Sequence, residues 1–274
     1  MYHLFYFSGT GNTWWIAGAL RSALQDMQHN VPMHSVEEQI VFDDLPSDAH
    51  LIIGFPAYGS SAPYPMRRFI ETLPDGHGRA VSIFVCHAMA SGDTGLHVGA
   101  ALQKKGYALR CILHMRTPNN IHIPSFRFTK PMSTDAADRF LEKRRSDVQR
   151  FARAIVSGKI VLCGAHPFGR LLGSVQRRHV DAMIKKAGGQ LAVVTERCAQ
   201  CGICTTICPV GNISRERDRY AFGNECVLCM RCYNACPTNA ICFGAKCGDT
   251  RKYPRYRDPG GFIQWCVKQK RVTP

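Results

Sequence analysis

The sequence predicts an α/β protein: a doubly wound parallel sheet of five strands, followed by a small α+β domain rich in cysteine. Three observations carry this prediction. Short apolar runs alternate with helical patterns over the first 157 residues, a loop rich in Gly and Thr follows the first run, and two cysteine runs of equal spacing lie near the C-terminus. Alternating strands and helices are typical of a parallel sheet covered on both faces. The 274 residues suffice for one large or two modest domains.

The five strands are expected at apolar segments of strand length, namely 2–7, 31–36, 49–55, 80–86 and 107–115. The third segment is fully apolar, so we expect it at the centre of the sheet. Apolar residues recur at helical spacing between and after these segments. They predict helices at 14–28, 65–73, 95–105 and 134–156.

The loop after the first strand reads Ser8-Gly9-Thr10-Gly11-Asn12-Thr13. It has no Lys, so it is not a P-loop, and Trp14 stands where a dinucleotide-binding motif has its third Gly. The loop offers three hydroxyls, an amide and free backbone N–H groups at a helix N-terminus, which suits a terminal phosphate. A simple helix cap with a glycine turn would need only one of those hydroxyls. The loop therefore predicts a phosphate site.

Two cysteine runs share the pattern C-x2-C-x2-C-x3-C-P and begin 28 residues apart, at Cys198 and Cys226. Bacterial ferredoxins hold two 4Fe–4S clusters with this spacing, and the fourth Cys of each run binds the other cluster. The first cluster is then expected at Cys198, Cys201, Cys204 and Cys236, and the second at Cys226, Cys229, Cys232 and Cys208. Zinc is less suited because it takes four ligands in two pairs. Disulfides are not expected without an export signal.

The other six of the 14 cysteines are Cys86, Cys111, Cys163, Cys242, Cys247 and Cys266. None is expected as a ligand, and the first three are expected as buried apolar side chains. Clusters and spare thiols imply a reducing compartment, so we expect the cytoplasm. Residues 2–20 carry no charge, but they lack a basic leader and contain the polar loop, so a strand, loop and helix explain them better than a signal segment.

The polar loop resembles the FMN phosphate loop of flavodoxins, Ser/Thr-x-Thr-Gly-x-Thr, at all four defined positions. The resemblance implies FMN binding by Ser8, Gly9, Thr10, Gly11, Asn12 and Thr13. It also implies two loops beside the flavin ring, at Pro56, Ala57, Tyr58 and Gly59 and at His87, Ala88, Met89, Ser91 and Gly92. Both follow strands at the carboxyl edge, where open α/β sheets bind ligands. Tyr58 is expected to stack on the flavin, and packing on the next helix is its alternative role.

Residues 139–186 contain 12 Lys or Arg and three acidic residues. Within this stretch, 158–190 are expected to form a helical bridge with apolar residues at helical spacing. A basic amphipathic helix can lie on a membrane surface. We instead expect its apolar face to pack on the neighbouring domain.

The whole chain resembles the flavodoxin–ferredoxin fusion proteins of anaerobic bacteria, which combine an FMN-type domain, a helical bridge, a two-cluster ferredoxin domain and a tail containing Arg and Tyr. Arg255-Tyr256-Arg257 matches the tail. The resemblance implies a flavodoxin-like domain at 1–157, a basic bridge at 158–190, a ferredoxin domain at 191–246 and a basic tail at 247–274. Residues 210–213 and 238–241 continue the two cysteine runs alike, which indicates an internal duplication.

The expected function is electron transfer between two 4Fe–4S clusters, FMN and a redox partner. The formal charge of +15 falls to roughly +9 with these cofactors, which favours a partner with an acidic docking face. No nucleic-acid motif and no integral membrane segment is found, while peripheral membrane contact stays open. One alternative is a flavin-dependent reductase of a small substrate, with His87, His122 or Tyr58 as proton donor. The other is a basic, redox-sensing binding protein.

Overall fold

The computed structural model describes residues 1–42, 45–127, 130–217, 219–244, 249–257 and 259–272. Contacts divide the chain into two compact units. The sheet unit comprises Met1–Ser8, Asn12–Thr117 and Phe140–Val180, and the cysteine unit comprises Gly9–Gly11, Pro118–Arg139 and Asp181–Pro274. This division splits the expected bridge, 158–190, after Val180. The four domain boundaries drawn from the sequence stay a prediction, and Cys247 lies outside the described residues.

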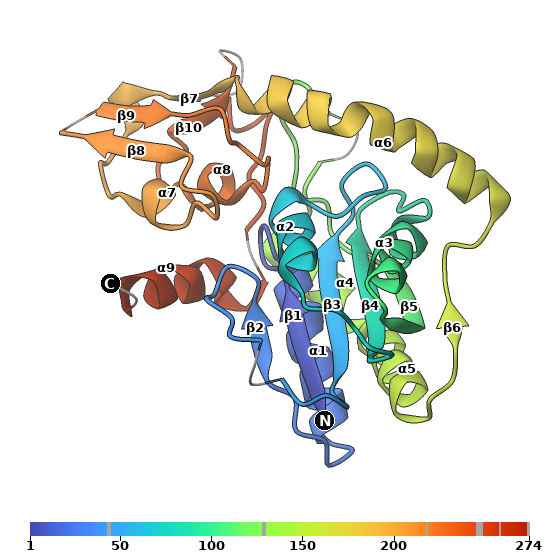
Figure 1. Ribbon diagram of the computed structural model, residues 1–274. Coiled ribbons are helices and arrows are strands. Elements are labelled where there is room, and N and C mark those ends of the chain that lie inside the picture. Colours follow the sequence, from blue (N-terminus) through green and yellow to red (C-terminus); the bar gives the residue numbers. More distant parts are fainter. Residues whose placement is uncertain (43–44, 128–129, 218, 245–248, 258, 273–274) are drawn as a thin grey trace. The chain divides into compact units, whose positions relative to one another are not determined.

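The sheet unit is built on one parallel sheet with the strand order β2-β1-β3-β4-β5-β6 (Figure 1). The strands are β1 (Tyr2–Tyr6), β2 (Met33–Ser35), β3 (His50–Pro56), β4 (Ala80–His87), β5 (Ala108–Arg116) and β6 (Val161–Leu162). The order of the first five is that of the flavodoxin-like doubly wound fold. The predicted fold class is therefore confirmed.

The sheet has one strand more than predicted. β6 pairs Val161 with Cys111 and Leu162 with Ile112 at the edge of the sheet. Both of its residues are exposed. The run Ile160-Val161-Leu162-Cys163 is apolar, but so short a run does not distinguish a strand from part of a helix, and it falls within the expected helical bridge.

Four helices of the sheet unit surround the sheet: α1 (Asn12–Gln25), α2 (Tyr64–Thr72), α3 (Thr94–Lys104) and α5 (Arg145–Val156). The chain moves from β1 to β2 in one direction and from β3 through β5 in the other. Right-handed crossovers therefore place α1 on one face and α2 and α3 on the opposite face. α5 packs along α1. The chain reverses direction between β1 and β3, which is where such sheets bind ligands.

The single helix expected at 134–156 is two helices, α4 (Thr134–Glu142) and α5. The N–H of Arg144 bonds to the carbonyl of Leu141 at 2.8 Å, three residues back. This tighter bond makes a turn at Lys143 and Arg144 and ends α4.

The centre of the sheet is closely packed around Gly54 of β3. A Cβ at this position would lie 1.9 Å from Cζ of Phe84, which is fully buried in β4. The ring of Phe84 therefore occupies the space that a side chain would need.

We predict that Gly54→Ala lowers the stability of the sheet unit by about 1–3 kcal/mol, because Phe84 must leave its position. Gly18→Ala in α1 is the matched control. Its Cβ would meet nothing within 4 Å, and Ala favours a helix over Gly by about 0.5–1 kcal/mol. Urea unfolding followed by circular dichroism should show opposite shifts of the midpoint. An unchanged midpoint for Gly54→Ala would contradict this packing.

The cysteine unit contains two small antiparallel sheets, β7 (Leu191–Val193) with β10 (Ile241–Phe243), and β8 (Ile213–Glu216) with β9 (Arg219–Phe222). Its short helices are α7 (Ile203–Thr206) and α8 (Arg231–Ala235), with one-turn 3₁₀ segments at Thr195–Arg197 and Pro259–Gly261. The tail forms α9 (Phe262–Val272), and α6 (Pro167–Gly188) enters this unit at Asp181. This arrangement agrees with the small α+β domain that the sequence predicts.

The tail is tied to α8 by hydrogen bonds. The guanidinium of Arg255 lies 3.3 Å from the ring centroid of Tyr233, and its Nη2 donates to the carbonyl of Ile241 at 2.9 Å. The N–H of Tyr256 donates to Oδ1 of Asn234 at 3.0 Å. Tyr233 and Tyr256 are almost fully buried. The Arg-Tyr segment is thus part of the core of the cysteine unit.

Along the part of the chain that the structure describes, no helix has both the length and the apolar composition needed to cross a bilayer.

Candidate cluster and cofactor sites

The backbone of the two cysteine runs repeats at the same offset as the sequence. Three pairs of residues 28 positions apart have positive φ: Gln200 and Leu228 (both 53°), Gly202 (71°) and Met230 (66°), and Gly211 (62°) and Asn239 (54°). Four of the six are not glycine, and left-handed backbone costs such residues about 1–2 kcal/mol each. The same strained turns at equivalent places support the internal duplication expected from the sequence.

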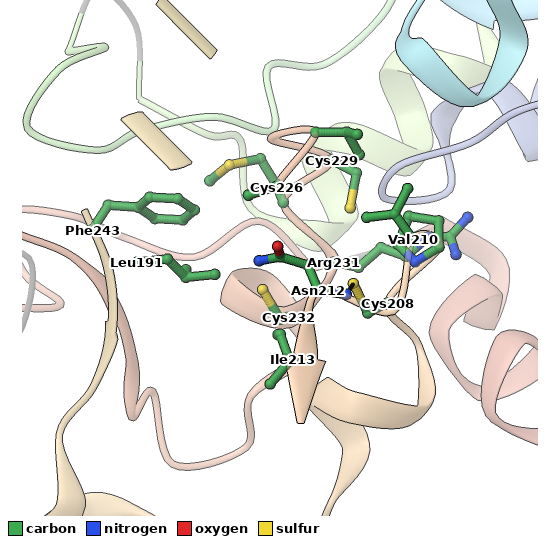
Figure 2. A pocket seen from close by; sticks show the side chains of 13 residues that line it. Leu191, Cys208, Val210, Asn212, Ile213, Cys226, Cys229, Arg231, Cys232 and Phe243 are labelled. Atoms are coloured by element: carbon green, nitrogen blue, oxygen red, sulfur yellow. Dashed lines mark hydrogen bonds between the residues drawn. The ribbon is translucent and has the colours of Figure 1, made fainter. Parts of the chain in front are cut away.

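Four cysteines of the second expected set, Cys226, Cys229, Cys232 and Cys208, line one hollow of about 350 Å³. Figure 2 shows their side chains around it, with Leu191, Ile213 and Phe243 as apolar walls. The pKa of Cys229 is raised to about 12. Burial is the main cause, and the nearby guanidinium of Arg231 acts in the opposite direction. Burial also raises the pKa of Cys232 well above its usual value, and the thiolates of Cys229, Cys226 and Cys208 raise it further.

The first expected set is grouped in the same crossed manner. The pKa of Cys204 is raised to about 11, chiefly by burial and also by the thiolates of Cys201, Cys236 and Cys198. Cys236 comes from the second run but lies within electrostatic reach of the first. Cys208 comes from the first run and acts on Cys226 and Cys229 of the second. This grouping supports the crossed assignment of ligands.

Backbone N–H groups point at the fourth sulfur of each run. The N–H of Asn212 donates to Sγ of Cys208 at 3.2 Å, and the N–H of Ala240 donates to Sγ of Cys236 at 3.1 Å. Both donors lie four residues after the cysteine. Burial raises the pKa of Cys236, but hydrogen bonds from nearby N–H groups and from Thr238 bring it below its usual value. Such bonds stabilise a thiolate ligand and help to set a cluster's reduction potential.

Within the described residues, no three His, Cys, Asp or Glu side chains close around a single metal ion. A 4Fe–4S cube binds its four thiolates through four different irons, whereas zinc gathers all its thiolates at about 2.3 Å from one centre. Eight thiols in two crossed sets of four, all but the exposed Cys201 buried or half-buried, with N–H donors to sulfur, fit two cubes.

The polar loop is split between the two units. In the sheet unit, Ser8 and Thr13 are almost fully buried, and Oγ of Ser8 accepts the N–H of Trp14 at 3.3 Å. This bond caps the start of α1. In the cysteine unit, Oγ1 of Thr10 accepts a hydrogen bond from the amide of Asn120 at 2.7 Å. Asn120 was not predicted, because it lies in an irregular segment more than 100 positions away.

The loops after β3 and β4 lie at the carboxyl edge of the sheet, as expected. Tyr58 is half-buried and pairs with Ser61 across a tight turn in which Gly59 and Ser60 have positive φ. In the second loop, burial lowers the pKa of His87, and Met89 is 62% exposed. His122, expected as a further proton donor, belongs to the cysteine unit and packs its ring against Tyr253.

The first half of α6 is tied to both loops of the sheet unit. Oγ of Ser60 donates to Gln176 at 2.5 Å, and the guanidinium of Arg177 donates to the carbonyl of Ser60 at 3.0 Å. Arg177 also forms an ion pair with Asp93 at 2.5 Å. These partners were missed because opposite charges far apart in sequence do not reveal that they pair. Four apolar side chains of α6 are exposed, namely Phe168, Leu171, Val175 and Met183.

Comparison with known proteins identifies the C-terminal part. Residues 197–241 match the family described as 4Fe-4S dicluster domain. A segment of 57 residues is 39% identical to an uncharacterized ferredoxin of Methanocaldococcus jannaschii and covers 19% of this chain and 74% of that protein. The chain belongs to the 4Fe–4S ferredoxin family. Outside the ferredoxin segment, the sheet unit has the flavodoxin-like strand order, so the chain joins the two folds as the sequence predicts.

Solved structures similar to this chain include a flavodoxin from the domain Archaea, with 15% identity, a TM-score of 0.40 and coverage of 57% of this chain and 98% of that one. Oxidised Flavodoxin 2 from Bacillus cereus has 16% identity, a TM-score of 0.42 and coverage of 57% and 97%. The fold assignment of the sheet unit rests on its strand order.

We predict that Cys236→Ser removes the cluster of the first run, because Cys236 lies with Cys198, Cys201 and Cys204. Cys208→Ser is the matched variant and should remove the cluster of the second run. Iron analysis and EPR of the anaerobically purified variants should each show about half of the wild-type iron, with different remaining signals. Identical remaining signals would contradict the crossed assignment.

We also predict that replacing Thr10 and Thr13 by Ala weakens FMN binding at least tenfold, because each hydroxyl bonded to a charged phosphate contributes about 1.5–3 kcal/mol. Thr72→Ala, which removes an exposed hydroxyl at the end of α2, is the control. Fluorescence titration of the flavin-free protein with FMN measures the change. Unaltered affinity in the double variant would place the phosphate elsewhere.

Proposed function

We propose that this protein is an electron carrier that passes electrons between two 4Fe–4S clusters and FMN and on to a redox partner protein. The crossed grouping of eight thiols is the observation that carries the proposal. A crossed arrangement brings two cubes close together. The thiolate of Cys204, from the first set, contributes to raising the pKa of Cys232 in the second set. Two adjacent one-electron centres suit relay better than chemistry on a substrate.

The flavin part of the proposal rests on the polar loop at the start of α1. Bound FMN would add a centre that exchanges one or two electrons, while each cluster exchanges one. Ser8, Thr10, Asn12 and Thr13 would hold the phosphate together with backbone N–H groups at the helix N-terminus. Tyr58 would cover one side of the ring, and His87 and Met89 would stand at the other.

The partner is proposed to present an acidic docking face. The chain has 35 Lys and Arg against 20 Asp and Glu, and the excess remains after two clusters and a phosphate are counted. A positive protein attracts an acidic carrier over a distance of about one Debye length, roughly 8–10 Å at physiological salt. We place this exchange in the cytoplasm, where thiols stay reduced.

The proposal predicts about eight irons and one FMN per chain in anaerobically purified protein. An anaerobic redox titration followed by EPR and visible spectra should show two cluster transitions and a flavin transition. The protein is then mixed rapidly with titanium(III) citrate. The clusters and the bound flavin should come to the same potential at a higher rate than the rate at which free FMN is reduced under the same conditions. The flavin-free Thr10/Thr13 double variant is the control for the cluster signals.

Four irons or fewer together with bound zinc would reject the two-cluster assignment. Eight irons without any FMN would reject the flavin part alone. An acidic ferredoxin used as partner should exchange electrons more slowly as salt rises. A rate independent of salt would reject the acidic docking face.

A further inference from the structure

Arg231 is a buried cation inside the second cysteine run. It is 2% exposed, it begins α8, and it stands between the expected ligands Cys229 and Cys232. It lines the hollow around which the four thiols of the second set are arranged (Figure 2). Arginine is rarely so deeply buried, since removing its charge from water is costly.

The contacts of Arg231 hold its charge in place. Within the cysteine unit, its Nε donates to the carbonyl of Gly9 at 3.2 Å, and its Nη1 donates to the carbonyl of Ile207 at 3.1 Å. Its guanidinium lies 5.4 Å from the ring centroid of Phe262. Two carbonyl oxygens and an aromatic face orient the guanidinium.

The first run has no equivalent charge. Ile203 occupies the position 28 residues earlier, so Cys201-Gly202-Ile203-Cys204 corresponds to Cys229-Met230-Arg231-Cys232. The left-handed residues and the N–H donors to sulfur are repeated in both halves. Arg231 is therefore a difference in charge between two sites whose turns and N–H donors repeat.

A 4Fe–4S core with four thiolates is anionic, and one added electron makes it more negative. A fixed cation beside the cluster favours that reduced state, and more strongly inside a protein than in water, because the surroundings screen the charge less. No bond forms or breaks in this step. One electron enters the cluster from a one-electron reductant, and the guanidinium keeps its protons because its pKa lies far above neutrality.

We propose that Arg231 is a positioning residue that raises the reduction potential of the second cluster and so makes the two clusters unequal. This inference rests on the cluster assignment of the proposed function. The first run has the uncharged Ile203 in the place of this buried cation.

The test compares Arg231→Leu, Arg231→Lys and the control Ile203→Leu in full-length, anaerobically purified protein. Each is titrated with dithionite and redox mediators and followed by EPR. Arg231→Leu should make reduction of the second cluster at least tenfold less favourable, which is about 59 mV for one electron. Arg231→Lys should recover most of the shift, and Ile203→Leu should leave both potentials unchanged.

Repeating the comparison in the Cys236→Ser background assigns the shift, because only the second cluster is expected to remain there. If Arg231→Leu does not retain its iron, Arg231→Gln and Arg231→Lys make the same comparison of uncharged with charged side chains. Equal potentials in the charged and uncharged variants would overturn the proposal. So would a shift of the same size in both clusters.

If the wild-type protein contains zinc or only four irons, the proposed function is rejected. The iron analysis shows this before any titration is made. The two failures are therefore distinguishable.

Discussion

The cysteine unit depends on bringing eight thiols close together inside a small domain. Burial is the main cause that raises the pKa of Cys229 to about 12, and burial together with neighbouring thiolates raises the pKa of Cys232 well above its usual value. Thiolates in such a place are stable only when positive metal centres neutralise them. The apolar core beside them is small, consisting chiefly of Tyr233, Phe243 and a few aliphatic side chains. A domain of this size gains much of its stability from the metal that its ligands bind, so cluster loading and folding of this unit are one process.

The two cysteine runs repeat the same local backbone structure but differ in their side chains. Left-handed residues turn the backbone at the same steps in both runs, and an N–H donor follows the fourth cysteine at the same distance. The side chains between the ligands differ, and among them only the pair Ile203 and Arg231 differs in charge. An internal duplication gives two similar sites, and the proposed role of Arg231 is to separate them in energy.

Local patterns allowed the sequence to predict much of this structure. The cysteine spacing predicts both sets of thiols, because three ligands come from within seven residues and the fourth has a fixed offset. The alternation of apolar runs and helical patterns predicts the first five strands. β6 was missed because its short apolar run, 160–163, does not distinguish a strand from part of the expected helical bridge. The turn at Lys143 and Arg144 was missed because neither Gly nor Pro marks it. The pairs Asp93–Arg177 and Thr10–Asn120 join distant segments, and no local pattern reports such contacts.

The long-range contacts of Gly9 affect the order in which parts of the protein fold. The bond between Arg231 and the carbonyl of Gly9 spans 222 residues of sequence, and a Cβ on Gly9 would lie 2.5 Å from the carbonyl of Cys229. Gly9 is synthesised well before its partners, which lie more than 200 residues further along the chain. Contacts of such long range form late in folding. The tip of the polar loop therefore takes its final shape only after the second cysteine run has emerged and folded, which places maturation of the iron–sulfur part before completion of the loop.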